Sequence, residues 1–243
     1  MKKTKQMNNF LIHGVDYSFD PSKNSEIANY QWFMHALSTG SWENDTFAVF
    51  NNVKDFTKTA IDIGAWIGPT SIWLSKHFNN VIAVEPDKVA LKSLKANLKS
   101  SNCDNNVTII ERPIYSKSNV KLFFGNNVNI AAELGDSTSQ LKNQLTNEKD
   151  FETLTLTLGD ILKDAKDVSF IKLDIEGGEE HIIPELFETC SKQNISLWIS
   201  FHYTWWKDSN IDRFEKYFSL AKNEKNIAEF VKKYPFGSIF LTF

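Results

Sequence analysis

The chain has 243 residues, of which 42% are hydrophobic, and carries a formal net charge of −3 with a pI near 6.0. This length supports one sizeable core, so a single domain is expected. The charge lacks the basic excess of a dedicated nucleic-acid binder, and no nucleic-acid partner is predicted. The two cysteines, Cys103 and Cys190, offer neither a disulfide framework nor a CxxC metal clip.

No segment approaches the roughly 20 apolar residues of a membrane span. The apolar run after the N-terminal lysines is short and ends at His13, so it does not fit a signal peptide. We therefore expect a cytoplasmic protein without a membrane span. The sequence leaves its oligomeric state open.

The first 55 residues are mixed in pattern. We expect residues 1–55 to form a small N-terminal helical cap, with short helices over 29–37 and 42–50, on a main domain of residues 56–243. From residue 59 onward, segments typical of strands and of helices alternate. Strands are expected over 59–63, 80–86, 106–110, 119–124, 153–158, 168–176, 195–202 and 237–243, and helices over 69–77, 87–100, from 179, and over 211–233.

Two local features qualify this alternation. Residues 125–150 are polar and weakly patterned, and they are long for a structureless loop, so we expect this loop to be either functional or mobile. Asp160 stands where a helix N-cap belongs. The alternation as a whole is typical of an open, doubly wound, mostly parallel α/β sheet with helices on both faces. Ligands of such sheets bind at the carboxyl ends of the strands.

The first strand of this series runs into a glycine turn, "IDIGAWIGPT" (residues 61–70). Gly64 and Gly68 allow a sharp turn and a close approach of the backbone to a ligand. A helix begins directly afterwards, and its N-terminal amides would face that ligand. Glu85 ends the next strand, where a carboxylate can accept hydrogen bonds from two vicinal ribose hydroxyls. Together these features predict a nucleoside site.

The details of the turn separate two kinds of nucleoside ligand. A dinucleotide site favours GxGxxG, but Trp66 occupies the position of the second glycine and would crowd a pyrophosphate. Asp62 would repel phosphates, whereas it would attract a cationic amine or sulfonium. S-adenosylmethionine carries both cations and no phosphate, so it fits better. A glycine turn with a buried, hydrogen-bonded Asp62 is the structural alternative.

A second polar stretch, "FIKLDIEGGEEH" (residues 170–181), ends a later strand. If the strand extends through it, Lys172, Asp174 and Glu176 lie on one face. Ionisable groups in a row at a strand end are costly unless they are paired or functional. The stretch therefore indicates either an active site or an ion-pair network that supports the fold.

His202 ends the following strand and is followed by "YTWW". A neutral imidazole there could take a proton from a substrate hydroxyl. Tyr203 and Trp205 could form an aromatic platform for a sugar or another ring. Ordinary core packing is the alternative for these rings.

Taken together, "WENDTFAVF", "IDIGAWIG", "VIAVEPD", "FIKLDIEGGEEHII" and "LWISFH" resemble the FkbM-like family of S-adenosylmethionine-dependent methyltransferases. The matching segments span roughly residues 42–202. The resemblance implies a class I methyltransferase (Rossmann-like) fold, a seven-stranded sheet whose last strand is antiparallel, and the terminal "SIFLTF" suits that strand.

The resemblance also implies functional positions. The cofactor turn falls on Asp62, Gly64, Ala65 and Gly68, the ribose acid and its neighbour on Glu85 and Pro86, the signature acids on Asp174 and Glu176, the strand-end histidine on His202, and an acidic position of open role on Glu43. The sequence departs from the family in three places. Trp66 stands where many members have Asn, Gly159 stands where an acid is common, and residues 103–150 match poorly. The adenine contacts are therefore not assigned.

The expected function is an O-methyltransferase that uses S-adenosylmethionine and methylates a hydroxyl of a small molecule, such as a sugar or glycolipid precursor. His202 or Asp174 is expected to take the proton, with Glu176 orienting the acceptor and Glu43, Tyr203 and Trp205 binding it. A divalent metal on Asp174 and Glu176 is an alternative that is not favoured, because only two carboxylates are evident.

Two other classes of function remain open. The chain could be a nucleoside-binding protein without catalysis, or, less well supported because of Trp66, a nicotinamide-dependent oxidoreductase. The chain has no Asn-Pro-Pro-aromatic motif of the kind that amino-methylating DNA enzymes carry, which argues further against a nucleic-acid acceptor.

Overall fold

The computed structural model describes residues 7–27, 29–125, 139–146, 148 and 150–243. Its centre is a six-stranded sheet in the order β11-β10-β9-β3-β4-β5. The strands are β3 (Asp55–Ile63), β4 (Phe78–Val84), β5 (Val107–Ile110), β9 (Val168–Leu173), β10 (Ser196–Ser200) and β11 (Ser238–Leu241). All neighbours are parallel except β10 and β11, so the predicted antiparallel last strand is confirmed.

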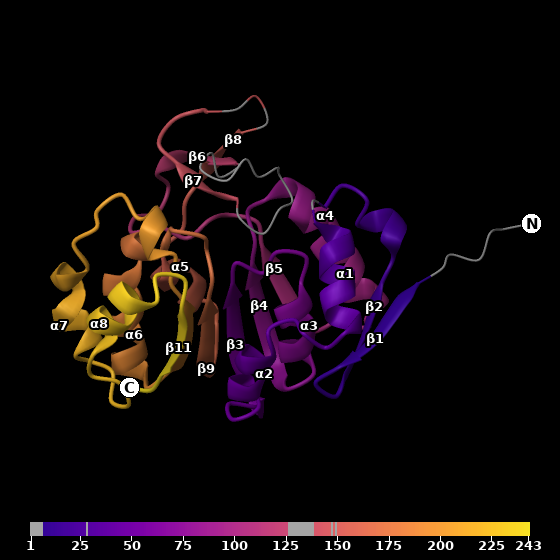
Figure 1. The fold of residues 1–243 in the computed structure, drawn as a ribbon, viewed down its shortest axis with the longest axis horizontal. Coiled ribbons are helices and arrows are strands. Elements are labelled where there is room, and N and C mark those ends of the chain that lie inside the picture. Colours follow the sequence, from indigo (N-terminus) through magenta and orange to yellow (C-terminus); the bar gives the residue numbers. More distant parts are fainter. Residues whose placement is uncertain (1–6, 28, 126–138, 147, 149) are drawn as a thin grey trace, which may run out of the picture.

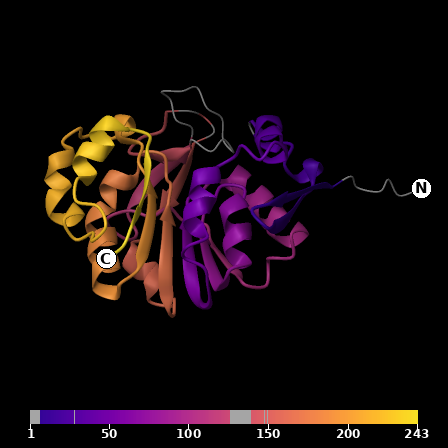
Figure 2. The same cartoon turned by 60° about the horizontal axis from the view of Figure 1, so that its bottom comes forward.

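Helices cover both faces of this sheet (Figures 1 and 2). The helices are α1 (Tyr30–Ser38), α2 (Asn44–Phe50), α3 (Pro69–Ser75), α4 (Lys88–Ser100), α5 (Leu158–Leu162), α6 (Ile183–Gln193), α7 (Glu215–Phe218) and α8 (Ile227–Lys233). The doubly wound arrangement expected from the sequence is therefore confirmed. Within the described residues the sheet has six strands and not seven, because residues predicted as a further strand, 119–124, belong to a separate small sheet.

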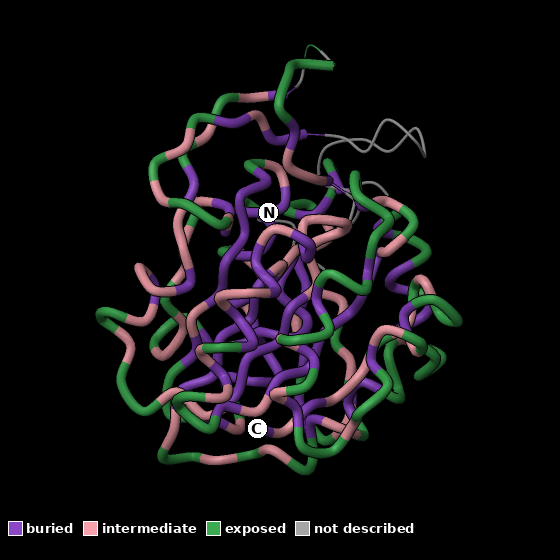
Figure 3. The backbone as a smooth tube through the Cα atoms, turned by 90° about the vertical axis from the view of Figure 1, so that its left-hand side faces the viewer, coloured by how far each residue is buried: buried purple, intermediate pink, exposed green. Residues whose placement is uncertain are grey.

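The two-residue period of the strands creates two cores. Ala60, Phe170 and Trp198 point to the layer of α1–α4 and are buried there among its aromatic and aliphatic side chains. Their neighbours in sequence, including Ile61 and Ile171, point to the opposite layer of α5–α8. The inner strands are buried on both faces near their carboxyl ends, as is typical of parallel sheets. Buried backbone accordingly fills the centre of the molecule (Figure 3).

The N-terminal segment was predicted to be a helical cap, but it also contains strands. It begins with an antiparallel hairpin of β1 (Asn8–Ile12) and β2 (Val15–Phe19). The turn is His13-Gly14, with φ angles of 49° and 79°, values that suit the tight turns of hairpins. The Tyr17 hydroxyl donates to the Pro69 carbonyl (2.9 Å), so the hairpin is tied to the start of α3.

A second small sheet, in the order β7-β6-β8, lies above the central sheet in Figure 1. It consists of β6 (Lys121–Gly125), β7 (Gln140–Lys142) and β8 (Phe151–Leu154). The prediction of a loop over 125–150 is therefore wrong at β7, and residues 126–138 lie outside the described part. A buried ion pair, Lys142 Nζ to Asp150 Oδ1 at 3.0 Å, joins β7 to the residue before β8.

Two predicted boundaries need correction. β9 ends at Leu173, so Asp174 and Glu176 lie in the following turn and the alternation argument does not apply to them. Thr157, not Asp160, is the N-cap of α5; Asp160 completes the capping box as its N3 residue. Among the described helices, none is long and apolar enough to cross a membrane.

Candidate active site

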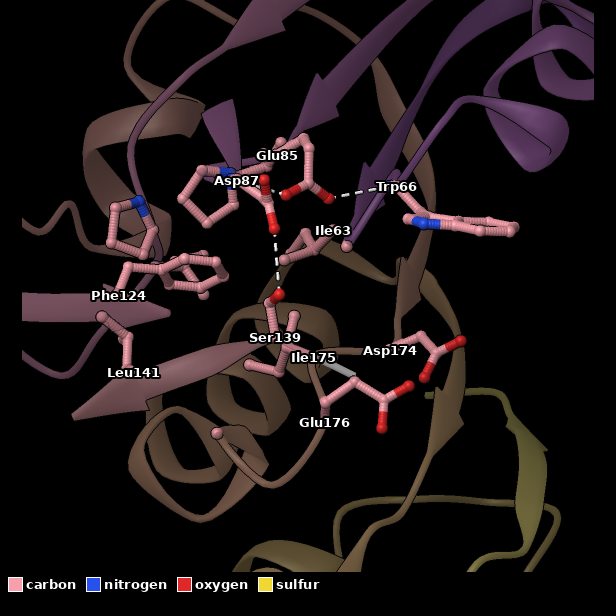
Figure 4. Close-up of a pocket in the computed structure, with 16 residues that line it drawn as sticks. Ile63, Trp66, Glu85, Asp87, Phe124, Ser139, Leu141, Asp174, Ile175 and Glu176 are labelled. Carbon is pink, nitrogen blue, oxygen red and sulfur yellow. Dashed lines mark hydrogen bonds between the residues drawn. The ribbon is translucent and has the colours of Figure 1, made fainter. Parts of the chain in front are cut away.

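A cavity opens at the carboxyl ends of β3, β4 and β9 (Figure 4). Its walls come from the turns that follow these strands and from β6 and β7 of the small sheet. The lining residues include Ile63, Gly64, Trp66, Glu85, Pro86, Asp87, Phe124, Ser139, Leu141, Asp174, Ile175 and Glu176. The position is the one expected for a ligand of a doubly wound sheet.

The glycine turn is required by a close approach of two backbone segments. Gly64 has a φ of 82°, and a Cβ there would lie 1.7 Å from the Asp174 carbonyl oxygen. Gly68 has a φ of 94° and precedes α3. The amides of Gly64 and Ala65 both donate to the Val84 carbonyl. Gly64 lines the cavity, whereas Ala65 and Gly68 lie behind it and shape the turn.

Asp62 is fully buried and does not line the cavity. Its Oδ2 accepts hydrogen bonds from Thr70 and Ser71, both at 2.6 Å. Its Oδ1 lies 3.3 Å from Lys172 Nζ, which also donates to the Gly64 carbonyl (2.8 Å). This arrangement corresponds to the structural alternative, in which Asp62 holds the turn. A direct contact with a cofactor stays a prediction.

Glu85 lies at the end of β4 and faces the cavity. Its Oε2 accepts from the Trp66 amide and its Oε1 from the Asp87 amide, both at 2.7 Å. Burial, and after it the Asp87 carboxylate, raises the pKa of Glu85 to about 8 against the effect of these two hydrogen bonds. Each carboxylate oxygen keeps capacity for a further donor, so the side chain can still accept from a diol.

The apolar side of the cavity was not found from the sequence. Phe124 of β6 and Leu141 of β7 form it, beside Ile114. Ser139 donates to Asp87 Oδ2 (2.9 Å) and so connects the small sheet to the end of β4. These residues lie in the segment that matched the family poorly. Only the apolar alternation of β6 hinted at them.

The predicted acids and histidine do come together, although not along one strand. His202 follows β10, and its Nε2 lies 3.1 Å from Glu176 Oε2 and 3.8 Å from Asp174 Oδ1. The turn after β9 makes this possible, because Glu176 adopts a φ of 58° there. We call Asp174, Glu176 and His202 the strand-end cluster. Its three donor atoms lie within 4.8 Å of one another, so the cluster could also hold a metal ion.

A fourth residue, Glu179, supports the cluster and was missed from the sequence. It is fully buried, and its Oε1 accepts from His202 Nδ1 (2.9 Å) and from the Gly177 amide (3.1 Å). Its Oε2 accepts from Trp206 Nε1 (2.8 Å). Burial opposes ionisation, but the His202 charge and these hydrogen bonds hold the pKa of Glu179 below its ordinary value. The "GGEE" stretch was its only sequence signal.

The pKa of His202 is governed by the carboxylates around it. Burial lowers its pKa, but the carboxylates of Glu179, Glu176 and Asp174 outweigh this effect and raise the pKa to about 10. Burial, with Asp174 and Glu179, raises the pKa of Glu176 to about 8 despite the opposing charge of His202. A pKa of about 10 favours the imidazolium form of His202 at neutral pH, and the role of His202 as a neutral base stays a prediction.

The predicted acceptor-binding residues divide into two groups. The Trp205 ring stacks on His202 with centroids 5.2 Å apart, beside the cluster. Tyr203 instead donates to the Ser209 carbonyl and packs on Trp206, so it does not join the cluster. The structure adds Phe236, whose 55%-exposed side chain lies 5.3 Å from Trp205 between ring centroids.

Glu43 precedes α2 and accepts a hydrogen bond from Thr46. Burial raises its pKa, and Asp174 and Lys172 are among the charges that act on it. Glu43 is therefore close enough to the cluster to be affected by its charges, but it does not line the cavity. Its role in acceptor binding stays a prediction.

Comparison with known proteins gives a consistent picture. The family model described as the methyltransferase FkbM domain matches residues 62–226. Among solved structures, the FkbM methyltransferase of Methylobacillus flagellatus KT is 14% identical, with 91% of this chain and 57% of that chain covered and a TM-score of 0.49. This chain thus spans little more than half of that protein.

Two further structures are similar at a lower level. A protein of Streptococcus mutans in complex with SAH is 14% identical over 77% of this chain and 79% of that one, with a TM-score of 0.40. The precorrin-6y C5,15-methyltransferase of Geobacter metallireducens GS-15 is 14% identical over 72% and 69%, with a TM-score of 0.40.

Proposed function

Since the chain belongs to the FkbM methyltransferase family, we propose that it transfers a methyl group from S-adenosylmethionine to a hydroxyl of a small molecule. The acceptor is a sugar or a glycan or glycolipid precursor. The cofactor occupies the cavity at the ends of β3 and β4, and the acceptor binds beside the strand-end cluster.

One observation carries the cofactor assignment. Glu85 presents a carboxylate to the cavity directly beside the glycine turn. A buried acceptor at the end of the second parallel strand suits the two ribose hydroxyls of a nucleoside. The apolar wall of Phe124 and Leu141 lies on the same cavity and suits the adenine ring.

The acceptor side follows from the position of the cluster. Asp174 and Glu176 line the cavity, and Trp205 stacks on His202 next to them. An aromatic face beside hydrogen-bonding carboxylates suits a sugar, which has an apolar ring face and polar edges. The methyl group moves from sulfur to the hydroxyl oxygen, and the hydroxyl proton passes to a carboxylate of the cluster. Asp174, whose side chain is 28% exposed, is the most accessible one.

Most of the rate enhancement would come from alignment. Methyl transfer is a direct displacement in which the positive charge of the sulfonium disappears. Orienting the two reactants can lower the barrier by about 7–11 kcal/mol at best. The chain therefore needs a site that holds the two ligands in line more than it needs a strong base.

Isothermal titration calorimetry with S-adenosylhomocysteine, with NAD as the competing ligand, tests this proposal. We expect one site of micromolar affinity for the homocysteine nucleoside, lost in Glu85→Ala and retained in Glu111→Gln. Glu111 is a matched control because its carboxylate pairs with Lys95 on the surface. Binding of NAD in place of the nucleoside, or equal affinity in Glu85→Ala, would contradict the proposal.

A further inference from the structure

The strand-end cluster has the composition and spacing of a three-ligand metal site. Its atoms are two carboxylate oxygens and one imidazole nitrogen, within 4.8 Å of one another. Around a cation with bonds of about 2.0–2.2 Å, ligand atoms lie about 3–4.4 Å apart. The observed separations of 3.1 Å and 3.8 Å from His202 Nε2 already fall in that range. Binding a cation would require small side-chain movements and the release of the Nε2 proton of His202, because only a deprotonated imidazole nitrogen can be a metal ligand.

The histidine is oriented as a ligand by a buried partner. Metal-bound imidazoles usually donate their other N–H to a carboxylate, which fixes the tautomer and the ring plane. Glu179 supplies that carboxylate at His202 Nδ1, and Trp206 and Gly177 hold it in turn. Nε2 is thereby directed at Asp174 and Glu176. The sequence showed only the two carboxylates as metal ligands. The tertiary structure adds His202 as a third ligand and Glu179 as the residue that orients it.

The charges around the cluster also favour a cation. Three carboxylates, those of Asp174, Glu176 and Glu179, surround one imidazole. Lys172 is the neighbouring cation. Its ammonium lies closer to Asp62 (3.3 Å) and to the Gly64 carbonyl (2.8 Å) than to Asp174, whose Oδ2 is 3.7 Å away. Mixed carboxylate and imidazole ligands suit Mn²⁺ and similar divalent metals.

We propose that Asp174, Glu176 and His202 bind a divalent metal cation, of which Mn²⁺ is a representative, between the cofactor cavity and Trp205. The cation leaves coordination positions open on the cavity side, where it holds an oxygen atom of the acceptor close to the methyl donor. This assignment rests on the proposed function for the identity of the acceptor, whereas the metal site itself rests on the geometry of the cluster.

Mn²⁺ titration of the full chain, followed by electron paramagnetic resonance of free Mn²⁺, tests the inference with and without S-adenosylhomocysteine. We expect one site, with affinity reduced at least tenfold in Glu176→Gln. Glu180→Gln should bind Mn²⁺ like the unmodified chain, because Glu180 is also largely enclosed but pairs with Arg213 outside the cluster. Glu179→Gln should weaken binding about 10–100-fold through the orientation of His202.

Two results would overturn the inference: no Mn²⁺ binding up to millimolar concentration, or unchanged affinity in both Glu176→Gln and Glu179→Gln. Thermal melts of each variant show whether it is folded. If one of Glu176→Gln and Glu179→Gln does not fold, the Mn²⁺ affinity of the other decides the test. The same samples separate the two proposals. Nucleoside binding without Mn²⁺ binding refutes the metal site alone, and Mn²⁺ binding without nucleoside binding refutes the proposed cofactor.

Discussion

Glu85 gives the sharpest test of the electrostatics of the cofactor site. Its pKa is raised from 4.5 to about 8 in the folded protein, mainly by burial. The folded state therefore binds this proton more tightly than the unfolded state does. Below about pH 4.5 both states hold the proton and the group has no net effect. Between about pH 4.5 and 8 the unfolded carboxyl ionises first, so the free energy of unfolding falls as the pH rises.

The size of this effect follows from the same shift. A difference between 4.5 and about 8, at about 1.4 kcal/mol per pKa unit, corresponds to a loss of at most about 5 kcal/mol of stability above pH 8. Glu85→Gln removes this dependence. It also introduces a fixed penalty of about 1–3 kcal/mol, because the new amide group faces the Trp66 or the Asp87 N–H in place of an acceptor oxygen.

The pH dependence separates these two effects. Urea unfolding of the ligand-free chain and of Glu85→Gln, at intervals from pH 5 to pH 9, gives the difference in unfolding free energy. We expect the variant to be less stable near pH 5 and to gain on the unmodified chain steadily up to pH 8. Glu111→Gln should show no such trend. A difference that does not change with pH would refute the reasoning, since it would mean that the two amide hydrogen bonds keep Glu85 ionised in the folded state.

Two further predictions concern the glycine turn and the acid within it. Gly64→Ala should lower stability severely and abolish binding of S-adenosylhomocysteine. Gly14→Ala is the control: Gly14 has a similar φ of 79° but open space around its Cβ, so this change should cost only about 1–2 kcal/mol of stability. Thermal melts and calorimetry of both variants check this, and equal losses of stability would contradict the close approach of Gly64 to Asp174. Asp62→Asn should destabilise the fold by about 3–5 kcal/mol, because the buried Lys172 loses its nearer charge partner and keeps only Asp174 at 3.7 Å. A loss below 1 kcal/mol by urea unfolding, with nucleoside binding abolished, would instead favour a direct role of Asp62 in cofactor binding.

Local pattern was sufficient for much of this protein. The alternation of apolar strands and amphipathic helices predicted the doubly wound sheet, because burial on both faces requires continuous apolar strands. The glycine turn and Glu85 were also predictable, since chain reversal at a strand end has a short-range signature. The antiparallel last strand followed from the family resemblance and is confirmed by the pairing of β10 with β11.

Contacts between distant segments were decided by the tertiary structure alone. His202 and Glu179 are 23 residues apart in the sequence but form a hydrogen bond, so the sequence did not show that Glu179 is the partner of His202. The raised pKa of His202 could not be predicted either, because a pKa depends on burial and on every nearby charge. Phe124 lines the cavity as part of the small sheet, whose strand β7 was not recognised within a polar stretch of the sequence. The sequence by itself indicated at which strand ends ionisable side chains gather. The packing of the turns beyond those ends determined which side chains meet there, because that depends on long-range contacts that no local pattern encodes.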